Sequence, residues 1–220
     1  MLRMPPPRTR TEPREAFMTP SRSPCPGEAG DLLESMRRRR QTGPRHLVEP
    51  GPDEAQRRQL FEAAATAPDH GQILPWRFVL IGAQARARLG DAFEQALLER
   101  DAAAGEDERR RARDKASRAP FLALAVVREG GDGQEHIRPH ERMVSLGCAL
   151  QNLLLMAHAQ GFGAGLVSGL AMDSRALRAL FGLGRHERAV CFVAVGTAAR
   201  GREPRDKPLP ESFVGELAPR

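Results

Sequence analysis

Two short segments carry side chains suited to binding an anionic or polar ligand. The first is the basic run Arg37-Arg38-Arg39-Arg40, followed by Gln41. Guanidinium groups bind phosphate oxygens by charge-assisted hydrogen bonds, although such a run is also typical of a solvated helix end. The second segment runs from Ala67 to Phe78 and has His70 in a polar turn. That imidazole can hydrogen-bond a ligand, or it can be a turn histidine without a further role.

The sequence shows no pattern typical of nucleophilic catalysis, a metal site or a nucleotide-binding loop. No Ser-His-Asp or Cys-His set stands out, so we name no catalytic side chain. Cys25, Cys148 and Cys191 are widely spaced and lack any CxxC or Cys/His pattern, so we expect neither a disulfide framework nor a metal site. Cys148 and Cys191 lie in apolar runs and are expected to be small core residues. No GxGxxG opens a helix after the first strand and no GxxxxGK[ST] motif is present, so neither a Rossmann dinucleotide fold nor a P-loop has support.

The charge balance permits an anionic partner without pointing to nucleic acid. The chain has 34 Lys and Arg against 28 Asp and Glu, a formal charge of +6. Many arginines lie in the first 45 residues and in 108–118, and aromatic residues for base stacking are not interleaved with them. We therefore expect no nucleic-acid partner. There is no apolar run of about 18 residues and no secretory signal, so we expect a cytoplasmic protein without a membrane partner.

The chain divides into a tail, one principal domain and an arm. Residues 1–30 are rich in Pro, Arg, Ser and Thr and are expected to be disordered, because they can bury little apolar surface. Residues 31–200 are long enough for one well-buried core. Residues 201–220 form a Pro- and Arg-rich C-terminal arm.

Helices and strands alternate within that domain. Helices are expected to start at Asp31 and Asp173 and to cover 53–66 and 144–160, and a further helix carries Leu89, Ala92, Phe93, Ala96 and Leu97 on one face. Residues 105–118 are highly charged and indicate an exposed helix, a candidate mobile cover. Buried strands are expected at 77–81, 121–127 and 189–195. This alternation predicts an α/β or α+β fold with a sheet between helices.

Four segments, in order, resemble the nitroreductase superfamily, and in particular a compact bacterial subgroup of NAD(P)H nitroreductases. They cover about residues 35–200, and their order is far more specific than any one motif. The segments are Arg39-Arg40-Gln41, Ala67-Pro68-Asp69-His70 through Pro75-Trp76-Arg77-Phe78, the buried helix leading to Ala159-Gln160-Gly161-Phe162-Gly163, and the strand end Val195-Gly196-Thr197.

The resemblance implies an α+β fold in which a mixed sheet is sandwiched by helices and two subunits interlock as a homodimer. It also implies FMN at each end of the dimer interface and NAD(P)H as hydride donor. The implied activity is hydride transfer through FMN to nitroaromatic, quinone or similar electron-poor acceptors, with no obligatory acid or nucleophile among the side chains.

Family positions carry over to eight residues as flavin contacts. Gln41 stands where the family has Ser, and Thr66 where some relatives have Arg. The segment Leu166-Val167-Ser168 stands where relatives can have Trp-Arg-Ser, so backbone N–H groups and Ser168 are the expected donors to the ring. The complete implied set is Arg39, Arg40, Gln41, Thr66, His70, Leu166, Val167 and Ser168.

Further segments have weaker links to the resemblance. Residues 156–161 align with a segment proposed for nicotinamide-nucleotide binding, but we interpret them, like Trp76, as packing. A basic residue after the last strand often meets the flavin phosphate in related enzymes. The candidates are Arg200, Arg202, Arg205 and Lys207, which can equally form a solvated arm.

Two alternatives stay open. The same fold can serve a specialised flavoenzyme for enone reduction, dehalogenation or a biosynthetic oxidation. A protein of another class, a non-catalytic flavin or nucleic-acid binding protein, is suggested by the basic tail. The sequence does not determine the physiological acceptor or the preference between NADH and NADPH.

Overall fold

The computed structural model describes residues 26–199 and 206–218. The predicted disordered tail therefore lies outside the described residues except for 26–30, which are helical. They form the start of α1 (Pro26–Arg38), so this helix begins five residues before the predicted Asp31. Of the predicted C-terminal arm, residues 206–218 are described, and their side chains are exposed throughout.

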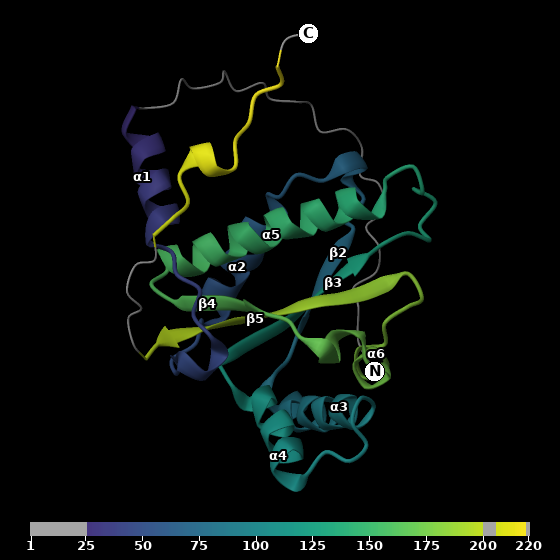
Figure 1. Ribbon diagram of the computed structural model, residues 1–220. Helices are drawn as coiled ribbons and strands as arrows, with labels where there is room; N and C mark the ends of the chain where they lie inside the picture. The colour runs from purple at the N-terminus through teal and green to yellow at the C-terminus, as the bar shows by residue number, and fades with distance from the viewer. Residues whose placement is uncertain (1–25, 200–205, 219–220) are drawn as a thin grey trace.

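A five-stranded sheet forms the centre of the molecule (Figure 1). Strand β5 pairs with β3 along residues 187–195 and with β4 along residues 192–196, so these two neighbours lie on its opposite edges. The strand β2 pairs with the far edge of β3, and β1 extends the sheet at the end of β5. The strands are β1 (Leu47–Val48), β2 (Trp76–Leu80), β3 (Phe121–Arg128), β4 (Gly163–Val167) and β5 (Glu187–Ala198).

The two long strands are the predicted buried ones. In β3 every residue except Arg128 is buried, and its Leu124 pairs with Phe192 of β5. Continuous apolar runs place side chains on both faces of the sheet, so both faces need a covering layer of helices. The strand β2 is less buried than predicted, because it lies at the edge of the sheet and most of its side chains are only partly covered.

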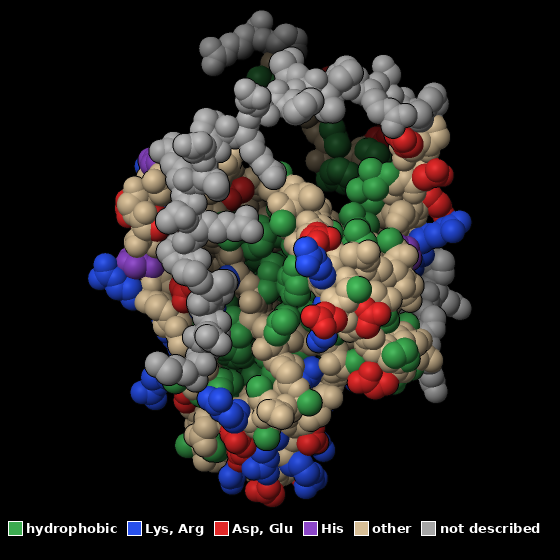
Figure 2. Space-filling view, turned by 180° about the vertical axis from the view of Figure 1, so that it is seen from behind, with side chains coloured by type: hydrophobic (Ala, Val, Ile, Leu, Met, Phe, Trp, Pro, Cys, Tyr) green, Lys and Arg blue, Asp and Glu red, His purple; other side chains and the backbone are tan. Residues whose placement is uncertain are grey.

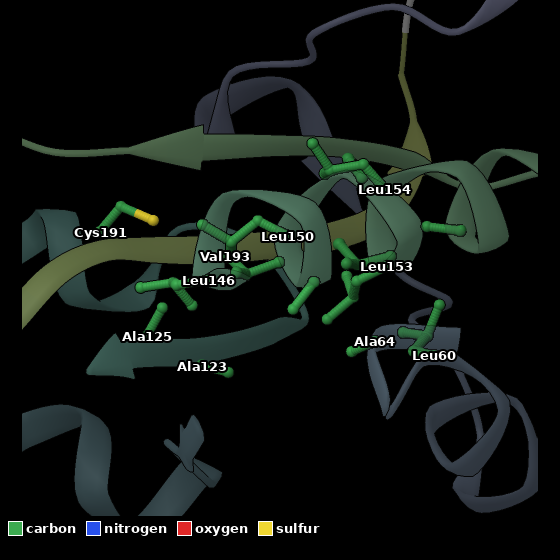
Figure 3. Packing of buried hydrophobic residues seen from close by; sticks show 14 of the residues in the cluster. Leu60, Ala64, Ala123, Ala125, Leu146, Leu150, Leu153, Leu154, Cys191 and Val193 are labelled. Carbon is green, nitrogen blue, oxygen red and sulfur yellow. The ribbon is translucent and has the colours of Figure 1, made fainter. Parts of the chain in front are cut away.

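One face of the sheet is covered by α5 (Pro139–Ala159), which lies above β4 and β5 in the view of Figure 1. Its Leu146 and Leu153 are completely buried in a cluster that also holds Leu60 of α2 (Glu54–Ala65) and Val193 of β5 (Figure 3). The helix α2 starts at the predicted position, where Asp53 and Gln56 form reciprocal caps with distances of 2.8 and 2.9 Å. The predicted central helix over 144–160 is thus confirmed, but it begins five residues earlier, at Pro139.

The opposite face is covered by α3 (Arg86–Leu98) and α6 (Arg175–Phe181), and α4 (Glu106–Asp114) packs on α3. The predicted apolar face of α3 is buried at Leu89, Ala92 and Ala96. Ser174, rather than the predicted Asp173, caps α6, because its Oγ accepts a hydrogen bond from the N–H of Leu177 at 3.2 Å. Gly182 ends this helix with φ of 57°, as its predicted place just beyond the helix requires.

The α+β prediction, with a sheet sandwiched between helices, is confirmed. All pairs among the five named strands are antiparallel. The mixed character of the sheet is confined, among the described residues, to a parallel bridge between Gln41 and Ala164. Short 3₁₀ helices lie in the connections between these elements and in the C-terminal segment. They are Pro44–His46, His70–Gln72, Ala83–Ala85, Lys115–Ser117, Leu170–Asp173 and Pro210–Ser212.

Candidate functional site

Two pockets lie at opposite ends of β4. The smaller, of about 220 Å³, is lined by Gly163 and Ala164 together with Arg39 and Arg40. The larger, of about 550 Å³, is lined by Val167 and Ser168 and by residues of α3 and α4. A strand rises about 3.3 Å per residue, so Ala164 and Ser168 are roughly 13 Å apart. The linings of the two pockets have no residue in common.

The arginine pair follows the end of α1 at the smaller pocket. The Nη1 atom of Arg39 is buried and has no hydrogen-bond partner among the described residues. Arg40 differs, because its Nη1 donates to the backbone carbonyls of Arg37 and Arg39. Leaving a buried charged donor unpaired is costly. Arg39 is therefore suited to an anionic oxygen supplied by a ligand.

His158 lies in the same pocket and responds to its positive charge. Burial, followed by the nearby guanidinium groups of Arg39, Arg40 and Arg38, lowers the pKa of His158. A lowered pKa favours the neutral imidazole, which adds no charge to compete with the arginines. In the segment 156–161, Ala157 is completely buried, in agreement with a packing role.

Gln41 fixes the arginine pair to β4. Its Nε2 donates to the carbonyl of Leu166 at 2.7 Å, and the N–H of Leu166 approaches its Oε1 at 3.4 Å. The two segments approach so closely that a Cβ on Gly165 would meet the carbonyl oxygen of Thr42 at 2.3 Å. The Gln41 amide thus acts on the backbone of β4, and its predicted flavin contact stays a prediction.

The remaining β4 residues face different surroundings. Leu166 packs against the α5 cluster, whereas Val167 packs against the cluster on the opposite face. The hydroxyl of Ser168 donates to the carbonyl of Val190 at 3.1 Å. Val167 and Ser168 line the larger pocket and Leu166 does not. Of the three predicted ring contacts, two therefore lie beside a space that could hold a ring.

Thr66 and His70 line neither pocket. Thr66 caps the end of α2 and accepts a hydrogen bond from Asn152 Nδ2 at 3.0 Å. The Nδ1 atom of His70 lies 2.8 Å from a carboxylate oxygen of Glu141. The pKa of Glu141 is lowered first by the N–H of Arg138 and next by His70.

His70 and Arg39 are far apart within one chain. His70 contacts Glu141 near the start of α5, whereas Arg39 lies in the pocket of His158 near its end. The helix rises about 1.5 Å per residue, which separates residues 141 and 158 by roughly 26 Å. A single chain does not bring His70 to the arginine pair.

The larger pocket has an apolar interior with a charged rim. Phe93 and Leu97 come from α3, and Leu122, Phe192 and Met172 come from the sheet and the turn after β4. Val167 and Ser168 were the lining residues predicted to contact a ligand, whereas the sequence pointed to no ligand for α4 and its neighbouring turns and predicted 105–118 only as a candidate cover. The available signal was the charge spacing in α4. The rim residues missed in this way are Arg100, Glu108, Arg111, Lys115 and Arg118.

Several other predictions concern residues outside these pockets. Trp76 is a packing residue, as interpreted: it is buried, and its Nε1 donates to Ser145 Oγ at 3.0 Å. Cys191 is buried, which raises its thiol pKa to about 11, and Cys148 is half-buried. Cys25, Arg200, Arg202 and Arg205 lie outside the described residues, and Lys207 is exposed.

The described ranges contain neither a membrane-spanning helix nor a cluster of metal ligands. No helix there has the length and apolar character needed to cross a membrane. No group of three or more His, Cys, Asp or Glu side chains in those ranges is arranged to hold a metal ion.

Comparisons with known proteins agree with this architecture. The chain is 35% identical over 169 residues to the "Putative NAD(P)H nitroreductase YdjA" of Escherichia coli (strain K12), with 76% of this chain and 88% of the relative covered. The fold matches a crystal structure of a nitroreductase-like family protein from Bacillus cereus with a TM-score of 0.71, 20% identity, and coverage of 84% of this chain and 95% of the other.

A second solved structure with the same fold is a complex with a ligand. It is a "putative nitroreductase in complex with fmn" from Desulfovibrio desulfuricans, with a TM-score of 0.61 and 24% identity, covering 86% of this chain and 98% of that one. The shared fold defines the class, a nitroreductase-like α+β protein. The model of the nitroreductase family matches residues 36–197, and the chain belongs to this family. Its membership supports the general prediction of an oxidoreductase of the nitroreductase type.

Proposed function

We propose that the protein is a cytoplasmic, FMN-dependent NAD(P)H oxidoreductase that reduces nitroaromatic, quinone or similar electron-poor acceptors. For a nitro group, one hydride from NAD(P)H and one proton from solvent give a nitroso group and water, and NAD(P)H becomes NAD(P)⁺. The observation that carries this proposal is the buried, unpaired Nη1 of Arg39 at one end of β4, with a large pocket at the other end.

The residues at the two ends of β4 fit FMN. Arg39 and Arg40 would hold its phosphate, because guanidinium groups bind phosphate oxygens by charge-assisted hydrogen bonds. Val167 and Ser168 would lie beside its ring, with the backbone N–H groups there as donors where reduction adds negative charge. When bound, FMN supplies the hydride chemistry, and the chain supplies binding and orientation. The FMN complex of the Desulfovibrio desulfuricans protein supports this assignment.

We further propose that the active form is a homodimer. On α5, Val144, Gly147 and Gln151 are exposed and Cys148 and Leu155 are half-buried, which leaves a mostly apolar stripe on the helix at the centre of the fold. The C-terminal segment also exposes Leu209, Phe213, Val214 and Leu217 and projects away from the sheet (Figure 1). A second copy would bury these surfaces. It would also bring its own Thr66 and His70 toward the arginine pair.

The test is the visible spectrum of the purified protein after FMN has been added and unbound FMN removed, recorded before and after anaerobic NADPH. We expect a flavin spectrum that NADPH bleaches. In Arg39→Gln, we expect FMN to dissociate roughly tenfold to a hundredfold more readily, the effect of losing a hydrogen bond to a charged group. Arg58→Gln is the matched control, since Arg58 is exposed and pairs with Glu62 on α2.

Two results would contradict the proposal. The first is a protein that stays colourless with FMN and shows no NADH- or NADPH-driven bleaching. The second is equal FMN affinity in Arg39→Gln and Arg58→Gln. A monomer by light scattering in the presence of FMN would contradict the dimer alone.

A further inference from the structure

The charged residues of α4 and of the turn after it include two sets that face different surroundings. Arg109 and Arg113 both turn toward Glu94 of α3, with N–O distances of 2.6 and 2.7 Å. The Glu94 side chain is only 7% exposed. These two arginines are four residues apart and share one side of the helix. They hold α4 against α3 and thereby fix one wall of the larger pocket.

The second set lines that pocket. Arg111 and Lys115, also four residues apart, lie on the rim with Arg100 and Arg118. The side chains of Arg111, Lys115 and Arg118 have no ion-pair or hydrogen-bond partner among the described residues. Within the same ranges, the Arg100 side chain is bonded only through its Nε, to the carbonyl of Ala96. The charged side chains of α4 gather at the lower end of the molecule in Figure 2.

The rim is strongly positive. Glu108 is the one acidic residue in the pocket lining, and its carboxylate accepts a hydrogen bond from the N–H of Gly105 at 3.1 Å. Four cations and one carboxylate give the lining a formal charge of +3. A cleft with one sign of charge and apolar walls concentrates ligands of the opposite sign.

The apolar side chains of the larger pocket add a second requirement for a ligand that binds there. Phe93, Leu97 and Phe192 present apolar surface below the cationic rim. This combination suits a planar apolar ring with an anionic substituent, because the ring can be buried while the anion stays at the partly solvated rim.

We propose that this pocket selects electron acceptors that carry a carboxylate or sulfonate on an aromatic ring. The proposal rests on the proposed function and narrows its acceptor class. The flavin phosphate is assigned to Arg39 and Arg40, so it does not account for Arg111 and Lys115. A nicotinamide dinucleotide also carries anionic groups, and the experiment separates the two sources.

The experiment compares 4-nitrobenzoate with 4-nitrobenzamide, which have similar size and different charge, using FMN-loaded protein and NADPH. The measured quantity is the ratio of kcat/KM for the anionic acceptor to that for the neutral one. In the double variant Arg111→Gln/Lys115→Gln, we expect this ratio to fall roughly threefold to tenfold, as two partly solvated charge interactions would give. The control is Arg58→Gln/Arg110→Gln, which removes the same charge outside the pocket lining and should leave the ratio unchanged.

A second measurement needs no variant. In the wild type, added salt should lower the same ratio toward one, because salt screens charges at a solvated rim. A ratio that is insensitive to salt, or equal in the pocket variant and the wild type, overturns the proposal. A change confined to the KM for NADPH also overturns it, since the rim then binds the hydride donor.

Failure of the proposed function gives a different result. A protein without NADPH-reducible flavin reduces neither acceptor, and this refutes the oxidoreductase assignment itself. A yellow protein that NADPH bleaches and that reduces both acceptors without regard to charge refutes only the acceptor class.

Discussion

Helix α5 is held to one face of the sheet by apolar contacts, whereas α4, on the other side, is held to α3 mainly by ion pairs. The side of α5 toward the sheet is made of residues such as Leu146 and Leu153, both completely buried. In α4 the one buried residue is Ala112, and Glu94 of α3 pairs with two of its arginines. Apolar packing fills the space under α5, while the charged attachment of α4 leaves room for a pocket. From this difference we expect α5 to contribute most to stability, and we assign the proposed ligand selection to α4.

The largest expected effect comes from opening a cavity under α5. Leu153→Ala should lower the free energy of unfolding by about 3 kcal/mol, within the range for buried leucines. Urea denaturation measures this loss. The control is Leu80→Ala at the edge of the sheet, where the side chain is 53% exposed and the change should stay below about 0.5 kcal/mol. If the two variants lost equal free energy of unfolding, apolar packing under α5 would not be a special source of stability, and the contrast with α4 would fail.

A smaller effect is expected from the ion pair next to the start of α5. The Arg142 side chain is completely buried and binds both carboxylate oxygens of Asp132, at 2.6 and 2.9 Å. Asp132→Asn should therefore cost about 2 kcal/mol, as for a hydrogen bond to a charged group. The apolar packing between α5 and the sheet is thus supplemented by the ion pair of Arg142 and Asp132.

The pH dependence of this variant tests the cause. Hydrogen bonds from Arg142 lower the pKa of Asp132 from 3.8 to about 2. A lowered folded-state pKa gives stabilisation that is complete above the unfolded pKa and is lost as the pH falls through the folded pKa. The stability difference between wild type and Asp132→Asn should be constant from about pH 7 to about pH 5 and shrink below about pH 4. A difference that persists unchanged to pH 2 would rule out this ion pair as its source.

The smallest global effect is expected at α4. Hydrogen bonding by Arg109 is the main cause of the lowered pKa of Glu94, so the carboxylate is charged near neutral pH. Glu94→Gln removes that charge and should release α4 locally. Hydrogen exchange in residues 106–114 should become faster while that of α5 is unchanged. Asp107→Asn, which disrupts an exposed pair with Arg110, serves as the control. Equally accelerated exchange in α4 and α5 would mean that the two sides unfold together.

Part of the fold could be predicted because some segments are determined by local pattern. The run 121–127 is apolar at every position, and such a run forms a strand wherever both faces are covered. The predicted helix over 53–66 is observed as α2, which Asp53 caps. The short elements were less predictable. The cap of α6 depended on which of two adjacent residues, Asp173 or Ser174, has extended backbone, and burial of β2 depended on its place at the sheet edge.

The candidate site was predictable only in part. The arginine pair and the Val167-Ser168 segment were found by resemblance, and each lies at one of the two pockets beside β4. The cationic rim of the larger pocket was missed. Its residues come from the turn after α3, from α4 and from the turn after α4. Local sequence does not show whether an exposed arginine faces a pocket or open solvent. The role of Gln41 in fixing β4 depends on a contact across 125 residues of sequence.

The sequence by itself determined the buried strands, the central helix and the family, because hydrophobic runs and ordered motifs are local properties of the chain. Only the tertiary structure decided which charges are paired and which face a ligand. Arg109 and Arg111 are two residues apart in one helix, yet one binds Glu94 and the other lines the pocket. Their difference arises because a helix turns by about 100° per residue and its neighbours lie on different sides.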